Sequence, residues 1–230
     1  MEYDDFKRRM LQISEMGYVD SRRRGPTGVG KTLEDLLGIK ESNIAGPDFS
    51  VYELKSGRKD ASSMLTLFTK KPEPNGVNRI LLEVYGYIAR KEGISEKELH
   101  VTVDSLKPNS VGLQLSVEGK RLYIANTPRV EAYYEEATLK QAFEAKYYKL
   151  VYVLANTRQM GKMEQFWFNE AYLLDGFSFE RFSELVREGI LKVDIRIGHY
   201  PDGRLHDHGT AFRILPKYLP RCFETIQQIL

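Results

Sequence analysis

The chain has 230 residues, enough for one large domain or two smaller lobes with a sizeable hydrophobic core. Its 34 Lys and Arg residues against 32 Asp and Glu residues give a net charge of +2, which excludes a uniformly basic nucleic-acid-binding surface but not a local basic face. The single cysteine, Cys222, excludes an intramolecular disulfide and argues against a cysteine-based zinc site.

The first predicted elements are two helices. Residues 1–18 have the spacing of an amphipathic helix. The residues expected to face inward are Phe6, Met10, Leu11 and Ile13. A basic, glycine-rich stretch follows at 21–32, and residues 32–39 then predict a short helix. Thr32 is its expected N-cap, because Asp35 lies three positions further on, as in a capping box.

The rest of the chain mixes strands and helices. Residues 45–48 predict a turn, 77–93 predict either a helix or a strand with a long turn, and three alternating segments at 98–106, 111–119 and 121–128 predict an antiparallel meander. Further strands are predicted over 49–56, 62–71, 149–155, 164–174 and 190–198, and helices over 139–148 and 177–189, with a polar loop and a strand over 199–214. Because strands and helices do not alternate strictly, we expect a mixed α/β or α+β fold around a mixed sheet.

Residues Gly25–Thr32 match the phosphate-binding pattern G-x-x-x-x-G-K-[ST] at each required position. A working phosphate-binding loop needs a buried strand before it and a long helix after it. Here the preceding residues, 18–24, are too charged for a central strand, and the following helix is short. We therefore interpret the motif as a coincidence, while ATP binding through Lys31 stays as an alternative.

An acidic and basic constellation lies in PDFSVYELK, residues 47–55. Glu53 and Lys55 are two apart on a predicted strand, so their side chains share a face, and Asp48 lies in the turn that leads into the strand. Two carboxylates suit Mg²⁺, which activates water for phosphodiester hydrolysis, and a lysine can orient that water. Glu34 can add a ligand or orient one. The alternative is a solvent-exposed Glu–Lys pair with no catalytic role.

Four blocks, at residues 28–38, 46–56, 65–70 and 193–214, resemble in order the MvaI/BcnI family of type II restriction endonucleases, and more distantly the mismatch-repair nicking endonuclease MutH. The resemblance implies a PD-(D/E)xK fold: one endonuclease domain of two lobes, with a catalytic lobe that includes about 1–75 and DNA-reading elements at about 190–215. It implies that Asp48 and Glu53 bind metal, that Lys55 is the catalytic lysine and that Glu34 is an auxiliary acid. It also places Lys31 beside DNA.

The C-terminal part carries candidate base-reading residues. Arg196 and Arg213 can each donate two hydrogen bonds to guanine, and Asp194 can accept one from cytosine or orient an arginine. His206 and His208 form an H-x-H pair, which can bind metal, but contact with DNA is the better interpretation. The alternatives are a same-face ion pair between Asp194 and Arg196 and a turn-supporting role for His208.

These observations predict a Mg²⁺-dependent, sequence-specific endonuclease that cleaves double-stranded DNA at a short GC-rich site and leaves 5′-phosphate and 3′-hydroxyl ends. By analogy with the family we expect a monomer that needs no ATP and has a cognate methyltransferase. With no signal-peptide core and no membrane-spanning run, we expect a cytoplasmic protein. The alternatives are a MutH-like nickase, a DNA-binding module with a decayed nuclease site, and an NTPase.

Overall fold

The computed structural model describes residues 1–39, 47–88, 97–147, 149–200, 202–207 and 209–230. The helices are α1 (Tyr3–Glu15), α2 (Gly28–Leu37), α3 (Val77–Tyr85), α4 (Glu136–Glu144), α5 (Phe179–Arg187) and the 3₁₀ helix η1 (Pro216–Arg221). The strands are β1 (Val19–Asp20), β2 (Tyr52–Arg58), β3 (Leu65–Thr69), β4 (Tyr87–Ile88), β5 (Lys97–Val103), β6 (Ser116–Glu118), β7 (Arg121–Asn126), β8 (Glu131–Glu135), β9 (Lys149–Met160), β10 (Met163–Asp175), β11 (Lys192–His199), β12 (Leu205–Asp207), β13 (Ala211–Ile214) and β14 (Thr225–Gln228).

The described residues divide into two compact units, and each unit is built from separate stretches of the chain. The first unit contains Met1–Ser63, Glu144–Ser178 and Leu219–Leu230. The second unit contains Met64–Phe143 and Phe179–Tyr218. The predicted catalytic lobe included about residues 1–75, whereas the first unit holds this stretch only as far as Ser63.

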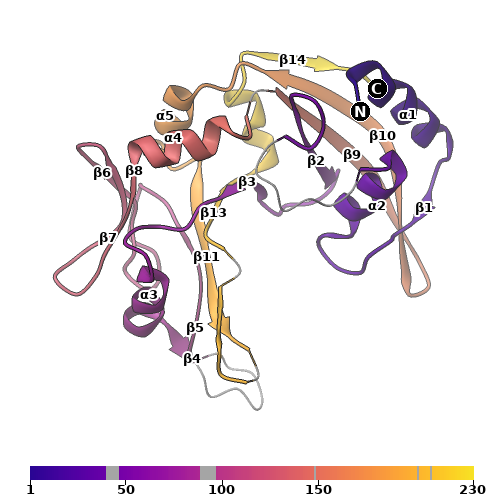
Figure 1. The fold of residues 1–230 in the computed structure, drawn as a ribbon. Helices are drawn as coiled ribbons and strands as arrows, with labels where there is room; N and C mark the ends of the chain where they lie inside the picture. The colour runs from indigo at the N-terminus through magenta and orange to yellow at the C-terminus, as the bar shows by residue number, and fades with distance from the viewer. Residues whose placement is uncertain (40–46, 89–96, 148, 201, 208) are drawn as a thin grey trace. The chain divides into compact units, whose positions relative to one another are not determined.

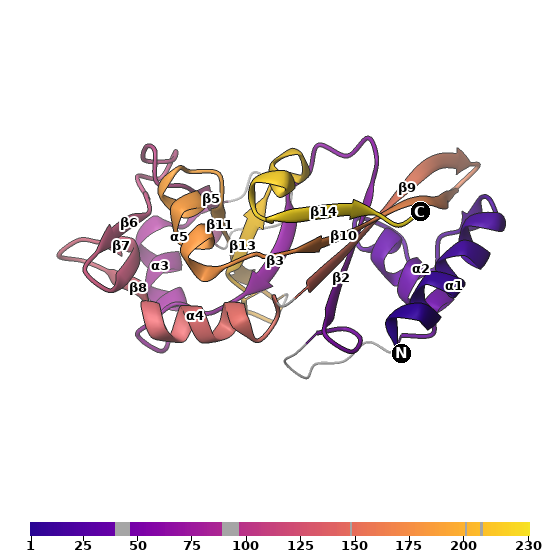
Figure 2. The same ribbon diagram turned by 90° about the horizontal axis from the view of Figure 1, so that it is seen from above.

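A mixed sheet forms the centre of the first unit. Its strand order is β1-β10-β9-β2, and β14 pairs with β10. β2 runs parallel to β9, while the other pairings are antiparallel. α1 and α2 lie next to each other against this sheet (Figures 1 and 2), and their apolar faces form one core with β2, β9 and β10.

The predicted N-terminal helix is confirmed as α1, with one error on its buried face. Phe6, Met10 and Ile13 are buried because positions i, i+4 and i+7 lie on one side of a helix. Leu11 is 53% exposed, so the prediction that it faces inward was wrong. It follows Met10 by one residue, and a step of about 100° moves its side chain away from the apolar stripe.

The second helix begins earlier than predicted. α2 starts at Gly28, so Thr32 lies inside the helix and is not its N-cap. Thr32 is fully buried, where its hydroxyl donates a hydrogen bond of 2.8 Å to the Gly28 carbonyl and accepts one of 2.9 Å from the Arg22 amide. The helix ends at Gly38, which adopts the left-handed conformation (φ 71°) that glycine tolerates best.

The second unit contains two sheets. One has the order β3-β13-β11-β5-β4, with β12 paired to β11, and the other has the order β6-β7-β8. The predicted meander was therefore only partly right, because the segment at 98–106 forms β5 and pairs with β11 instead. Buried aromatic rings from β3, β13, α4 and α5 pack against one another in the core of this unit. They include Phe68, Phe143, Phe182 and Phe212.

None of the helices in the described part of the chain has the length and apolar content that crossing a bilayer requires.

Candidate functional site

β2 presents two chemically different faces. Leu54 is buried in the core formed with α1 and α2. Glu53 and Lys55 extend from the other face, because side chains alternate along a strand. Lys55 Nζ lies 2.6 Å from Glu53 Oε1, which confirms that the two residues share a face.

Glu53 is a buried carboxylate with two cationic partners. Its side chain is fully buried, and a charged group at such a position needs compensating charge. Lys55 supplies one positive charge. Lys146, in the segment between α4 and β9, supplies another, with Nζ at 3.3 Å from Oε1 and 3.4 Å from Oε2. The sequence analysis missed Lys146, which is 93 positions from Glu53.

Asp48 lies at the edge of β2 that does not pair with β9. Its Oδ2 accepts a hydrogen bond of 2.8 Å from the Leu54 amide. The backbone of Tyr52 bonds to Phe49 on this same edge. The carbonyl of Leu54 leaves the strand on the side of its own amide, toward Asp48. Carboxylate and carbonyl oxygens, the ligands that hard cations prefer, thus gather here.

A buried tyrosine lies close to the two acids. Tyr147 is 6% exposed, and its ring meets Phe177 edge-on at 5.6 Å. Burial raises the pKa of its hydroxyl well above the ordinary value, and the negative charges of Glu53 and Asp48 raise it further. The phenol therefore stays neutral at physiological pH and adds no charge to the site.

Glu34 and Lys31 lie on α2, on the other side of β2. A methyl group placed on Gly30 would lie 3.7 Å from Ser56 Oγ and 4.0 Å from Glu34 Oε1, so both side chains border Gly30. The side chain of Ser56 leaves β2 on the face opposite to Lys55. Lys31 forms an ion pair of 2.8 Å with Asp35, one turn further along the helix.

The glycine-rich motif does not follow a central strand. β1 has two residues, lies at the edge of its sheet and runs antiparallel to β10. Arg58 instead holds the start of the motif, because its guanidinium donates to the carbonyls of Gly25 and Pro26 at 3.1 Å. The same guanidinium makes two bonds of 2.7 Å to Glu164.

In the second unit, Asp194 on β11 joins several polar side chains. It is 3% exposed, and one of its oxygens, Oδ2, accepts hydrogen bonds of 2.7 Å from both Arg196 and Arg213. The hydroxyl of Thr102 donates to the other oxygen at 2.9 Å. Burial raises the pKa of Asp194, but the bonds from Arg196, Arg213 and Thr102 lower it by more, so the pKa lies below the ordinary value.

The two arginines differ in how much of each side chain is available. Arg196 uses Nε for Asp194, and its side chain is half exposed. Arg213 uses one terminal nitrogen for Asp194 and the other for the Met64 carbonyl at 2.8 Å, and 19% of its side chain is exposed. The same-face ion pair between Asp194 and Arg196 that we considered is therefore present.

The polar face of this sheet continues beyond Arg196. His100 on β5 pairs in register with Arg196, and His206 on β12 pairs with Gly198. The His206 ring stacks on Tyr200, with 3.9 Å between ring centroids. Strand register and alternation place the His100 and His206 side chains on the face that carries Asp194 and Arg196. His208 lies outside the described residues.

Asp207, the acid between the two histidines of the H-x-H segment, uses its carboxylate for other hydrogen bonds. It therefore does not support the alternative that this segment binds a metal. Asp207 accepts hydrogen bonds from the Asn78 side chain at 2.9 Å and the Gly209 amide at 2.8 Å. Across the described parts of both units, no group of three or more His, Cys, Asp or Glu side chains is placed to hold a metal ion. Among the described residues, Asp48 and Glu53 offer two carboxylates, which suits Mg²⁺ because it retains several of its water ligands.

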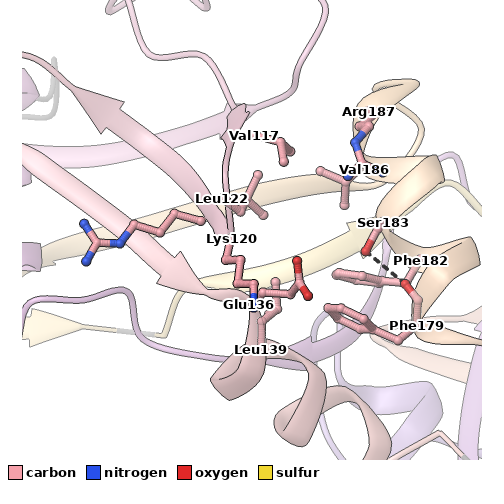
Figure 3. Close-up of a pocket in the computed structure, with 11 residues that line it drawn as sticks. Val117, Lys120, Leu122, Glu136, Leu139, Phe179, Phe182, Ser183, Val186 and Arg187 are labelled. Carbon is pink, nitrogen blue, oxygen red and sulfur yellow. Dashed lines mark hydrogen bonds between the residues drawn. The ribbon is translucent and has the colours of Figure 1, made fainter.

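Cavities in the second unit are separate from these residues. A cavity of about 40 Å³ between α4, α5 and the β6–β7 hairpin has room for water but not for a nucleotide (Figure 3). A wider groove of about 580 Å³ is lined by residues between Ser105 and Thr127 together with Tyr85 and Arg187. None of the candidate site residues lines either space.

Comparisons with known proteins agree with this architecture. The family model described as the MvaI/BcnI restriction endonuclease family matches residues 7–223. The restriction endonuclease MvaI–cognate DNA substrate complex is similar at a TM-score of 0.86 and 30% sequence identity, covering 100% of this chain and 100% of that chain. The structure of MvaI in the absence of DNA is similar at a TM-score of 0.58 and 29% sequence identity, covering 100% of this chain and 99% of that chain. Comparison with curated proteins gives no match.

The family match and the similarity to the MvaI–DNA complex define a nuclease fold of the restriction-endonuclease type. The chain belongs to the MvaI/BcnI restriction endonuclease family and, as a member, is a type II site-specific deoxyribonuclease. The resemblance seen in the sequence is therefore confirmed, and so is the mixed α/β fold.

Proposed function

We propose that this enzyme is Mg²⁺-dependent and cleaves double-stranded DNA at a short GC-rich site. The observation that carries the proposal is the buried Glu53 paired with Lys55 on β2, next to Asp48 at the strand edge. The similarity to a restriction endonuclease solved with its cognate DNA supports DNA as the partner.

In this proposal Asp48 and Glu53 hold Mg²⁺, which neutralises charge on the scissile phosphate and makes a water more acidic when bound. Lys55 orients the attacking water, and Glu34 has an auxiliary role from α2. The water oxygen forms a bond to phosphorus as the bond from phosphorus to the 3′ oxygen breaks. The leaving oxygen takes up a proton, so the products are a 5′-phosphate and a 3′-hydroxyl.

We assign base reading to the polar face of the second unit. Arg196 is the better placed of the two arginines to reach guanine, because half of its side chain is exposed while Arg213 is more enclosed. Asp194 holds both arginines and does not itself need to reach a base. We assign His206 and His208 to contacts with bases or phosphate, and Lys31 to contact with the DNA backbone.

The proposal includes a monomeric enzyme that needs no ATP and works beside a cognate methyltransferase that protects host DNA. We place it in the cytoplasm, the compartment of the DNA that such a pair acts on. The reducing conditions there suit a chain whose one cysteine, Cys222, is buried.

The experiment incubates purified protein with supercoiled plasmid and with genomic DNA, in Mg²⁺ and without ATP. D48A and K55M test the assigned catalytic residues, and K149M is the matched control, because Lys149 pairs with Asp175 and not with Glu53. Discrete fragments with wild type and K149M, absent with D48A and K55M, support the proposal, and mapping the ends gives the site and the end chemistry.

Other outcomes point elsewhere. Open circles without linear product indicate a nickase of the MutH kind. DNA retention without cleavage under any divalent cation indicates a decayed nuclease. The proposal fails if the wild-type protein cuts no DNA but binds ATP, and if Lys31→Ala abolishes the ATP binding.

A further inference from the structure

Glu53 has one more cation beside it than the E-x-K pattern supplies. Lys55 lies 2.6 Å from one carboxylate oxygen, whereas Lys146 lies at nearly equal distances, 3.3 and 3.4 Å, from both. Lys146 comes from the turn before β9, and the parallel pairing of β9 with β2 brings this turn to Glu53. The Lys146 side chain is 31% exposed, so its ammonium group lies at the boundary between the buried carboxylate and solvent.

Among the described residues named here, the charges at this site balance without any ion. Asp48 and Glu53 carry two negative charges, and Lys55 and Lys146 carry two positive charges. The two carboxylates attract a divalent cation and the two ammonium groups repel it, so the site as a whole gives the cation little net electrostatic attraction. A DNA phosphate at the same place supplies negative charge and offsets part of that repulsion.

We propose that Lys146 is a positioning residue that keeps Glu53 paired and the acidic site neutral in the DNA-free enzyme, so that divalent cations bind weakly until a phosphate enters. This inference rests on the proposed function, because it takes Asp48 and Glu53 as the metal ligands. When Lys146 is replaced, Lys55 still pairs with the buried Glu53. Loss of the Lys146 charge therefore leaves a folded site with a net negative charge, which attracts a divalent cation more strongly.

The test measures Mn²⁺ binding to the DNA-free enzyme from the EPR signal of unbound Mn²⁺, which needs no turnover. K146M and K146Q remove the charge, and K146R retains it. K149M removes a lysine three positions away that pairs with Asp175. We expect K146M and K146Q to bind Mn²⁺ at least about tenfold more tightly than wild type, and K146R and K149M to bind as wild type does. Thermal melts verify that each variant is folded.

Each result decides a different question. Unchanged or weaker Mn²⁺ binding in folded K146M and K146Q overturns the role of Lys146, since a purely structural lysine gives this result. If E53Q and D48A bind Mn²⁺ as tightly as wild type, the metal site of the proposed function fails, and this inference fails with it. Tighter binding in K146M that disappears in the K146M/E53Q double variant supports both.

Discussion

A single buried carboxylate organises the polar face of the second unit. Asp194 accepts bonds from two guanidinium groups and a hydroxyl, and each bond fixes the direction of a side chain. Hydrogen bonds to a charged acceptor contribute more to stability than neutral ones, about 1.5–3 kcal/mol each. Asp194 therefore determines both the stability of this sheet and the placement of Arg196.

Replacing Asp194 with Asn keeps the shape but removes the charge that both arginines share. We expect D194N to lower the free energy of unfolding by about 3 kcal/mol, since two guanidinium groups lose their buried counter-charge. We also expect a loss of cleavage of tenfold or more. Urea unfolding and a plasmid-cleavage time course measure the two effects. Wild-type cleavage by D194N would show that the placement of the arginines does not depend on this charge.

The stability of the protein should also depend on pH through Asp194. Its pKa lies below the ordinary value, so its contribution is complete above the pKa of an unfolded aspartate, about 4, and is lost as the pH falls toward the folded pKa. We expect the free energy of unfolding to fall between about pH 5 and about pH 3, and to fall less in D194N. Urea titrations at several pH values in this range test the prediction. If the free energy of unfolding falls equally with pH in wild type and D194N, the prediction is wrong.

Among the elements, the parallel pair β2–β9 leaves little space beside the candidate catalytic strand. The Tyr152 side chain on β9 passes over Gly57, so a methyl group at residue 57 would lie 2.6 Å from the tyrosine hydroxyl. Burial raises the pKa of Tyr152 to about 12, and the charge of Glu170 raises it as well. The ring is thus a neutral, packed group at the end of β2.

We expect Gly57→Ala to destabilise the protein by about 1–3 kcal/mol, the usual cost of overpacking. Removing the hydroxyl in Y152F should relieve the clash, so G57A/Y152F should lose less stability than the sum of the single variants. A double-mutant cycle of thermal or urea unfolding measures this coupling. Strict additivity would mean that Tyr152 is not what limits residue 57.

The segment before α2 depends on an arginine of β2. Arg58 binds the Gly25 and Pro26 carbonyls and forms a two-bond pair with Glu164 on β10. Lysine cannot make these four bonds together, because its three N–H donors radiate from a single nitrogen and cannot span the guanidinium fork. We expect R58K to speed amide hydrogen exchange at residues 25–28 by tenfold or more while α1 keeps its protection. Exchange that stays at the wild-type rate would show that other contacts hold this segment.

The sequence was sufficient for features that depend on local periodicity. The two-residue period of a strand placed Glu53 and Lys55 on one face, and the helical period identified Phe6 and Met10 as core. It was not sufficient where pairing is long-range. Lys146 reaches Glu53 only because β9 pairs with β2, and no local pattern signals a partner 93 positions away.

Capping rules failed at α2 for a related reason. Thr32 and Asp35 have the spacing of a helix start, but the helix extends back to Gly28. The Thr32 hydroxyl bonds to the Gly28 carbonyl four residues earlier and to the Arg22 amide. The preference of threonine for caps was thus overridden by a buried tertiary contact.

At the scale of the whole molecule, the chain passes between the two units several times. The sheet of the first unit takes β2 from the N-terminal stretch and β9 and β10 from a later stretch. The larger sheet of the second unit takes β3 and β5 from one stretch and β11 and β13 from another. Neither unit is therefore a continuous piece of sequence that can be separated by truncation.

A fragment that ends at residue 143 should not fold into either unit, because it lacks β9 and β10 from the sheet of the first unit and β11 and β13 from the larger sheet of the second, although it keeps the small β6-β7-β8 sheet. We expect collapsed chemical-shift dispersion in its NMR spectrum and no DNA retention on a filter, in contrast to the full chain. A dispersed spectrum from this fragment would show that one sheet can form without its central strands.

Under the proposed base-reading role, the carboxylate shared by Arg196 and Arg213 also constrains how this enzyme can acquire a new target. Exchanging either arginine alone removes one of the two guanidinium groups bonded to the buried Asp194, so the new side chain must lie beside a carboxylate that favours a cation. Diversification at this face therefore requires joint replacement of Asp194 with both arginines. Laboratory libraries that vary these three codons together should yield altered sequence preferences that one-codon libraries do not contain.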